Sequence, residues 1–394
     1  MTLAPRDAAD AAEGVQQALA ARRTFDVLGT GARRGFGRPV VAEEALDLSA
    51  LAGVVVYEPN ELVLTVGPAT PMADIRAMLA AERQHLAFEP PDLGPLWGLP
   101  AGQGSLGGAL STGLGGPRRV AAGAPRDHFL GFKAINGFGE AFAAGGRVVK
   151  NVTGYDLPKL IAGSFGTLSV LTEVTIKVLP APEQTLTLCV FGLDEAVGLS
   201  ALRDALGGAV QISGAAYLPE GEAPSRTLLR LEGVEPAVVA GAAHLTDKLA
   251  PLGGEVAPLD AAASIPLWRE IGEASVFAAS AGPVWRLSLP PAAAPALGAA
   301  LREAGMIGLY YDWGGGAIWL EGPPEAPDAG AAAIRALLQP TGGHATLIRA
   351  AEPVRAAASP FQPLDPGVAA LTQRVKRQFD PEGLFNPGRM YAGL

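Results

Sequence analysis

Three glycine-rich clusters in the first half of the chain constrain its fold most strongly. They are "VLGTGARRGFG" (27–37), "PAGQGSLGGALSTGLGGP" (100–117) and "GSFGTLSVL" (163–171). Successive glycines let backbone N–H groups turn toward an anion, and small hydroxyl side chains add donors without bulk. A long ligand with a diphosphate explains all three clusters, whereas three unrelated loops are the alternative interpretation.

The first cluster begins like a dinucleotide-binding G-x-G-x-x-G turn, because Gly29 and Gly31 follow a β-rich run. Arg34 stands where the third glycine belongs, and the glycines and proline of residues 35–39 oppose the helix that such a turn requires. We therefore predict a phosphate loop of a different fold. Arg33 and Arg34 offer positive charge to it, unless they form an exposed basic pair.

Composition excludes several classes of function. The 394 residues suffice for two or three domains, and 39 acidic against 30 basic residues argue against a nucleic-acid partner. The single cysteine, Cys189, excludes an intrachain disulfide and an iron–sulfur cluster held by four thiolates of this chain. The four histidines lack metal-site spacing, so we expect no metal centre.

The N-terminus has no signal-peptide layout, and no apolar run approaches the roughly 20 residues that span a bilayer. We therefore expect a cytoplasmic protein that reaches the inner membrane, if at all, through partners.

Residue patterns divide the chain near "LPAPEQ" (179–184), where the glycine clusters stop. Before this point we expect a helix over the first 25 residues, short β-rich runs, and a helix that Thr70 caps and that ends near His85. "LPKLIAGS" predicts a further helix and "RVVKN" (147–151) a strand.

After the boundary, strands alternate with helices, and some strands pair directly. This alternation predicts a split βαβ, ferredoxin-like layout that is duplicated. The expected strands are 185–191, 209–218, 226–232, 283–289, 305–312, 316–321 and 344–350, and the expected helices are 195–206, 235–250, 291–304 and 328–339. Residues 366–394 predict a helix followed by a fixed terminal path.

An ordered set of motifs carries a resemblance to a known family. "LGTGARRG", "GSLGGALSTGLGG", "AGAPRDHFLG", "VVKNVTGYDLPKLIAGSFGTL" and the terminal "FDPEGLFNPGR" together resemble the vanillyl-alcohol oxidase, or PCMH-type, flavoproteins. Within that family the fourth motif is similar to the FAD-binding subunits of bacterial glycolate oxidases (glycolate dehydrogenases). The resemblance is dense over the first 180 residues and clear over the last 20.

The resemblance implies an α+β fold with a two-lobed PCMH-type FAD-binding domain over residues 1–180. A ferredoxin-like cap domain would span 181–353, and a C-terminal helix and tail, 354–394, would return toward the FAD domain. The implied FAD-binding residues are Gly29, Thr30, Gly31, Ala32, Arg33, Gly104, Ser105, Gly107, Gly108, Thr112, Gly113, Gly115, Gly163, Ser164, Gly166, Thr167 and Val170.

FAD is expected without a covalent link, because no motif supplies a histidine or cysteine near the flavin ring and position 32 is alanine. The histidine-containing cap motifs of related 2-hydroxy-acid dehydrogenases are missing from "YYDWGGGAIWL" (310–320) and "GGHATLIRAAEP" (342–353). Oxidation of a 2-hydroxy acid needs a cation for the carboxylate, a base and a hydride acceptor. Arg286 and Arg349 are candidate cations, but each also fits an ordinary surface role, so no catalytic residue is assigned.

These features favour one subunit of a glycolate dehydrogenase complex, with a sister FAD-containing catalytic subunit and an iron–sulfur subunit as partners and a small 2-hydroxy acid as substrate. Two alternatives stay open. In the first, the chain is a self-sufficient FAD-dependent dehydrogenase of the D-lactate type. In the second, it is a non-catalytic scaffold that keeps the fold without flavin.

Overall fold

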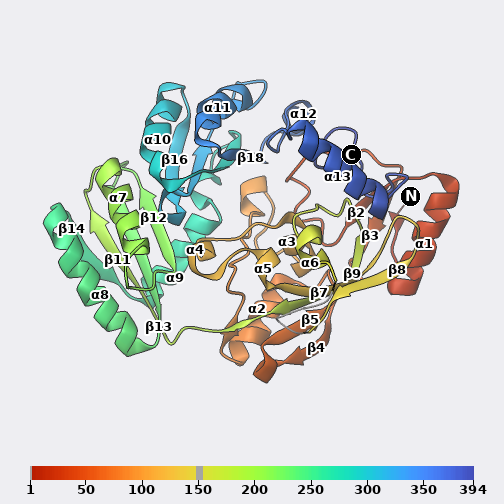
Figure 1. The fold of residues 1–394 in the computed structure, drawn as a ribbon, viewed down its shortest axis with the longest axis horizontal. Coiled ribbons are helices and arrows are strands. Elements are labelled where there is room, and N and C mark those ends of the chain that lie inside the picture. Colours follow the sequence, from red (N-terminus) through yellow and green to blue (C-terminus); the bar gives the residue numbers. More distant parts are fainter. Residues whose placement is uncertain (1, 148–153) are drawn as a thin grey trace. The chain divides into compact units, whose positions relative to one another are not determined.

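The structure, a computed structural model, describes residues 2–147 and 154–394 (Figure 1). The chain forms two compact units. Unit 1 comprises Met1–Leu114, Ala124–Ala181 and Ser359–Leu394, and unit 2 comprises Gly115–Gly123 and Pro182–Ala358. The segment 115–123, which we assign to the FAD-binding domain from sequence, groups with unit 2. The domain boundaries 1–180, 181–353 and 354–394 stay a prediction.

A small parallel sheet and helix α1 begin unit 1. The strand order is β1 (Thr2–Leu3), β3 (Glu44–Asp47), β2 (Phe25–Leu28). Helix α1 (Ala8–Ala21) starts where the Asp7 carboxylate accepts hydrogen bonds from the backbone of residues 9 and 10. Its Val15 packs with Phe25 and Leu46 in one core. The predicted N-terminal helix and the strand that leads into the first glycine cluster are both present.

The second sheet of unit 1 is antiparallel. Its order is β4 (Val54–Glu58), β5 (Val63–Val66), β9 (Val170–Lys177), β7 (Phe129–Ile135), β8 (Ala141–Gly145). Helices α2 (Met72–Ala81) and α3 (Leu106–Thr112) bury Ile75 and Leu110 in its core. Also in unit 1 are α5 (Pro125–His128), α6 (Leu157–Ile161), α13 (Pro366–Phe379) and the short pair β6 (Gln84–His85) and β10 (Leu179–Pro180).

Two local predictions for unit 1 need comment. Thr70 is not the cap of α2, because Pro71 precedes its first residue and makes no side-chain cap bond. The Thr70 hydroxyl instead accepts from Gly53 N at 2.9 Å and donates to Gly67 O at 2.7 Å. Most of the expected strand 147–151 lies outside the described residues.

Unit 2 contains one antiparallel sheet of eight strands built from two βαββαβ repeats. The first repeat is β11 (Gln184–Phe191), α7 (Glu195–Leu206), β12 (Gly214–Leu218), β13 (Arg226–Gly233), α8 (Glu235–Leu249), β14 (Glu255–Leu259). The second is β15 (Val284–Ser288), α10 (Ala294–Glu303), β16 (Ile307–Asp312), β17 (Ala317–Glu321), α11 (Ala331–Leu338), β18 (His344–Arg349). In the order β14-β11-β13-β12-β16-β17-β15-β18 each repeat contributes four adjacent strands, and the repeats join where β12 pairs with β16. This is the arrangement that the predicted duplication requires.

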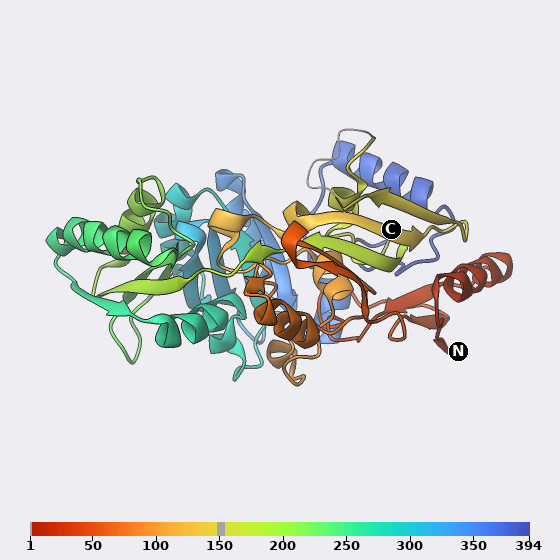
Figure 2. The ribbon, with the colours of Figure 1, turned by 90° about the horizontal axis from the view of Figure 1, so that it is seen from below.

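The two faces of this sheet are covered differently. Residues of α7, α8, α10 and α11 share one core with alternate strand residues, including Trp285 and Leu287. Helix α9 (Ala261–Gly272) lies on the other face, where the Trp268 indole donates to Thr187 Oγ1 at 2.8 Å. Figure 2 shows α8 and α9 on opposite sides of the sheet. Two further short helices of unit 2 are α4 (Arg119–Ala122) and α12 (Glu352–Ala357).

Candidate functional site

The first glycine cluster forms turns and no helix. Gly31 and Gly37 have φ of +72° and +86°, in the left-handed region that favours glycine. Arg34 N donates to Gly31 O at 3.2 Å, and Phe36 N donates to Arg33 O at 3.1 Å. Gly35, which follows the position of the third Rossmann glycine by one residue, therefore lies in a turn and does not begin a helix. The interpretation as a non-Rossmann loop agrees with the structure.

The second cluster contains helix α3, which the glycine-rich sequence conceals. The Ser105 hydroxyl caps the helix and accepts from Gly108 N at 3.3 Å. Gly107 N donates to Pro68 O at 2.7 Å. These two N–H groups already have partners, so the expectation of a backbone anion nest is wrong at these residues.

The third cluster closes against the end of α3. Gly163 and Gly166 have φ of +80° and +67°, and Phe165 between them is also left-handed at +56°. Gly163 N donates to Leu110 O at 3.0 Å, and Phe165 N donates to Ser111 O at 2.9 Å. The second and third clusters therefore form one surface.

The C-terminal "FNPGR" segment joins the first cluster to the third. The Asn386 side chain accepts from Val27 N and donates to Phe165 O, both at 2.8 Å. Arg389 Nη2 donates to Arg33 O at 2.9 Å. Residues more than 200 positions apart in sequence therefore hold the loops in place.

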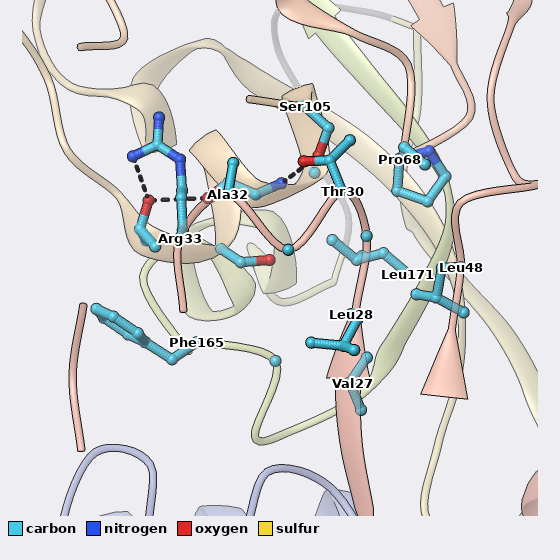
Figure 3. A pocket seen from close by; sticks show the side chains of 18 of the residues that line it. Val27, Leu28, Thr30, Ala32, Arg33, Leu48, Pro68, Ser105, Phe165 and Leu171 are labelled. Carbon is cyan, nitrogen blue, oxygen red and sulfur yellow. Dashed lines mark hydrogen bonds between the residues drawn. The ribbon is translucent and has the colours of Figure 1, made fainter. Parts of the chain in front are cut away.

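These segments enclose a cavity in unit 1 with about 800 Å³ of empty space, counting its solvent-open part. Leu28, Leu48 and Leu171 lie on one side, and Arg33 and Phe165 on the other (Figure 3). The lining is Val27, Leu28, Gly29, Thr30, Gly31, Ala32, Arg33, Arg34, Leu48, Pro68, Ala69, Ser105, Gly107, Gly108, Ser111, Thr112, Phe165, Gly166, Ser169, Leu171, Asn386 and Arg389.

The structure brings a majority of the predicted site residues together at this cavity. Those that line it are Gly29, Thr30, Gly31, Ala32, Arg33, Ser105, Gly107, Gly108, Thr112 and Gly166. Gly104, Gly113 and Val170 do not, Gly115 belongs to unit 2, and Gly163, Ser164 and Thr167 line a neighbouring cavity beside α13. Sequence reasoning missed Asn386 and Arg389, although the terminal motif that contains them was the available signal.

The two adjacent arginines have different roles. Arg33 Nη1 donates to Thr112 Oγ1 at 3.2 Å and Nη2 to Pro91 O at 2.9 Å. Burial lowers its pKa to about 10, so it stays cationic at neutral pH. Arg34 is exposed and forms an ion pair with Asp26. Both arginines line the cavity, but the charge of Arg34 is paired with Asp26.

Two buried polar atoms at the cavity have no hydrogen-bond partner among the described residues. They are Arg33 Nε and Ser169 Oγ. A buried donor without a partner costs about 1–3 kcal/mol, so such atoms are usually satisfied. A Cβ added at Gly31 would meet no atom within 4 Å, so the loop leaves open space beside it. The arrangement fits a polar, anionic ligand.

Other candidate residues are structural. The Arg349 guanidinium donates to Phe277 O and Gly282 O at 2.7 Å each and to Ser280 Oγ at 2.8 Å. Its Nη2 also lies 3.6 Å from Glu321 Oε1, so its hydrogen-bond and charge partners come from the protein itself. Cys189 is buried, and burial raises its pKa to about 11, as fits a core residue. Among residues 2–147 and 154–394 no cluster of three metal-ligating side chains occurs, and no helix has the length and apolarity to span a bilayer.

Comparisons with known proteins agree with this geometry. A family model described as an FAD binding domain matches residues 1–145. The chain is 36% identical to the glycolate oxidase subunit GlcE of Escherichia coli over 97% of both chains. It is 32% identical to the glycolate oxidase subunit GlcD of Bacillus subtilis, over 34% of this chain and 27% of that one.

Among solved structures, p-cresol methylhydroxylase superposes with a TM-score of 0.74 at 15% identity, covering 99% of this chain and 88% of that one. This likeness confirms the predicted PCMH-type α+β fold. Similarity to GlcE along nearly the whole length, together with the matched FAD-binding domain, shows that this chain is an FAD-binding protein that belongs to the GlcE family of glycolate oxidase subunits.

Proposed function

We propose that this chain is the FAD-binding subunit of a multi-subunit glycolate dehydrogenase, which oxidises glycolate to glyoxylate and passes the electrons to partner subunits. The observation that carries the proposal is the 36% identity to a glycolate oxidase subunit over 97% of each chain. The assembly is cytoplasmic in this proposal and reaches the inner membrane only through its partners.

The cavity of unit 1 is where we place FAD. When bound, FAD supplies a hydride acceptor for the C–H of a hydroxy acid. Arg33 offers its charge and Ser169 a hydroxyl to the ligand, and Arg34 and Arg389 bring two further guanidinium groups to the lining. Arginine suits phosphate because its planar fork donates two parallel hydrogen bonds. The predicted residues outside this cavity stay predictions.

We expect FAD to be held without a covalent bond. Covalent attachment needs a nucleophilic side chain such as histidine or cysteine, and the lining of the cavity contains neither. The one cysteine lies in β11 of unit 2. The flavin should therefore leave the protein on acid or heat denaturation.

The same lining explains why we propose partners. A general base for the hydroxyl proton is normally His, Asp, Glu or Lys, and none of these lines the cavity. We assign substrate oxidation to a sister FAD-containing subunit and onward electron transfer to an iron–sulfur subunit, since this chain has one cysteine. The names of the GlcE and GlcD relatives, both subunits of a glycolate oxidase, support such an assembly.

The test is purification of a tagged full-length chain, alone and co-expressed with the other subunits, followed by glycolate assays with an artificial electron acceptor. We expect a flavin spectrum in both preparations and glycolate turnover only in the complex. D-lactate serves as the second substrate in each assay.

Turnover by the isolated chain with either substrate would replace the proposal with a self-sufficient dehydrogenase. A colourless chain that takes up no FAD on reconstitution would replace it with a scaffold. Absence of co-purifying subunits and of glycolate turnover in the co-expressed preparation would refute the complex itself.

A further inference from the structure

Arg286 lies on the face of the unit 2 sheet opposite helices α7, α8, α10 and α11. Its neighbours in β15, Trp285 and Leu287, belong to the core beneath those helices. Because alternate strand residues point to opposite faces, Arg286 points away from that core. In register beside it stand Trp319 of β17 and Thr346 of β18.

Two indole rings surround this guanidinium. Arg286 Cζ lies 5.4 Å from the ring centroid of Trp313 and 5.7 Å from that of Trp319. Arg119 of α4 lies over the Trp313 ring as well, with Cζ 5.2 Å from its centroid. We name these four residues, Arg119, Arg286, Trp313 and Trp319, the Arg286 site.

The backbone of Trp313 is strained. Its φ is +56°, a conformation that a bulky residue rarely adopts and that costs about 1–3 kcal/mol. Its indole Nε1 donates to Gly116 O at 3.2 Å. Strain that the surrounding structure maintains is frequent where a side chain must be oriented for binding.

The Arg286 site carries excess positive charge. Arg286 Nη1 is buried and has no hydrogen-bond partner in the described part of the chain. Burial and the nearby Arg119 lower the pKa of Arg286 to about 10, and Asp312 opposes them, so the group remains cationic at neutral pH. Partial desolvation, Arg286 and Arg119 also lower the pKa of His344, so the positive potential of the site extends to this imidazole.

We propose that Arg286 and Arg119, held against Trp313 and Trp319, form a binding site for a small carboxylate anion. A carboxylate matches the guanidinium fork and would satisfy the unpartnered Nη1, while the indole rings shield the ion pair from water. Arg119 is exposed, so it can meet the same anion from solvent. The identification of that anion as a 2-hydroxy or 2-oxo acid rests on the proposed function; the carboxylate site itself does not.

The experiment uses the FAD-loaded full-length chain and oxalate, a dicarboxylate with no C–H bond to oxidise. Calorimetry measures the affinity, and the change in tryptophan fluorescence on binding, to which Trp313 and Trp319 contribute among the five tryptophans, is a second readout. We expect saturable binding of oxalate and at least a tenfold loss of affinity in Arg286→Met. Glycolamide, which has the size of glycolate without its charge, should not bind.

Arg269→Met is the matched control, because Arg269 is exposed on α9 of the same unit and should leave the affinity unchanged. Arg286→Lys keeps the charge without the fork and should give an intermediate affinity. Circular dichroism establishes that each variant is folded, and if Arg286→Met is not, Arg119→Met with its exposed side chain supplies the same test.

Wild-type affinity in a folded Arg286→Met variant, or absence of oxalate binding to the wild-type chain, would overturn the site. Neither result bears on glycolate turnover by the complex. Conversely, oxalate binding with no glycolate turnover in the complex would keep the carboxylate site and remove the proposed function.

Discussion

The cavity of unit 1, where we propose that FAD binds, and the Arg286 site of unit 2 are built in opposite ways. Glycines, small hydroxyls and backbone turns shape the cavity, and contacts between residues far apart in sequence close it. Large side chains shape the Arg286 site: Arg286 and Trp319 lie on paired strands, Trp313 lies in the turn between β16 and β17, and Arg119 lies on α4. Backbone cavities leave a glycine signature in a sequence, whereas a cross-strand cluster of arginine and tryptophan leaves none that stands out from ordinary strand residues.

The comparison predicts that removing the ion pair between Lys376 and Asp380, which we call the C-terminal anchor, damages the cavity most. Lys376 is buried, and its Nζ lies 2.6 Å from Asp380 Oδ2 and donates to Thr167 O at 2.7 Å and to Phe385 O at 3.1 Å. Lys376→Met leaves Asp380 buried without its counter-ion, which costs about 3–5 kcal/mol. We expect this loss in chemical denaturation, together with a lower FAD content.

Lys248→Met, at an exposed lysine of α8, should change the free energy of unfolding by no more than about 0.5 kcal/mol. The folded fraction of Lys376→Met should still bind oxalate, because the Arg286 site contains no residue of this anchor. An anchor variant with unchanged stability and flavin content would mean that the terminal segment merely covers the cavity.

A smaller effect is expected at Gly107. A Cβ at this position would lie 2.7 Å from Pro68 O and 2.7 Å from Pro68 Cβ, so a side chain there collides with protein before it reaches any ligand. We expect Gly107→Val to cost about 1–3 kcal/mol and to lower FAD affinity through displacement of α3. Thermal unfolding of the flavin-free protein separates the two effects, since a pure ligand clash would leave its midpoint unchanged.

The smallest effect concerns His344. Partial desolvation, Arg286 and Arg119 lower its pKa below the ordinary 6.5. The unfolded chain therefore binds the proton more readily, and the contribution of His344 to stability is lost as pH falls from about 6.5 through the native pKa. NMR titration of the imidazole should give this low value and a higher one in Arg286→Met or with oxalate bound. An unchanged value in both would separate His344 from the Arg286 site.

Sequence patterns predicted the duplicated repeats of unit 2 because each strand and helix there carries its own periodicity. Strand β14 and helix α9 were missed because β14 is a short edge strand that contains Pro258, and Pro266 interrupts the α9 pattern. In unit 1 the glycine clusters indicated the loops but not their partners. Asn386 and Arg389 reach the cavity through tertiary contacts, which no local pattern encodes.

The Arg286 site was only half visible in the sequence. Arg286 and Arg349 were equal candidates for a cation, and the structure distinguishes them by their partners: Arg349 binds backbone carbonyls, whereas Arg286 Nη1 has no partner in the described part of the chain. The register of β15 against β17 places Trp319 beside Arg286, and that of β15 against β18 places Arg349 beside Val284. Such registers depend on the whole sheet.

The central claim is that the cavity of unit 1 holds FAD, and Gly29→Val tests it most directly. A Cβ at Gly29 would meet only Ser105 Oγ, at 3.4 Å, so valine there projects into the cavity without displacing the fold. Gly367→Val is the matched control, because Gly367 is exposed and a Cβ there meets nothing within 4 Å. The measurement is the ratio of FAD to protein after purification. We predict that Gly29→Val loses FAD while remaining folded and that Gly367→Val retains it; full FAD occupancy in Gly29→Val would contradict the account.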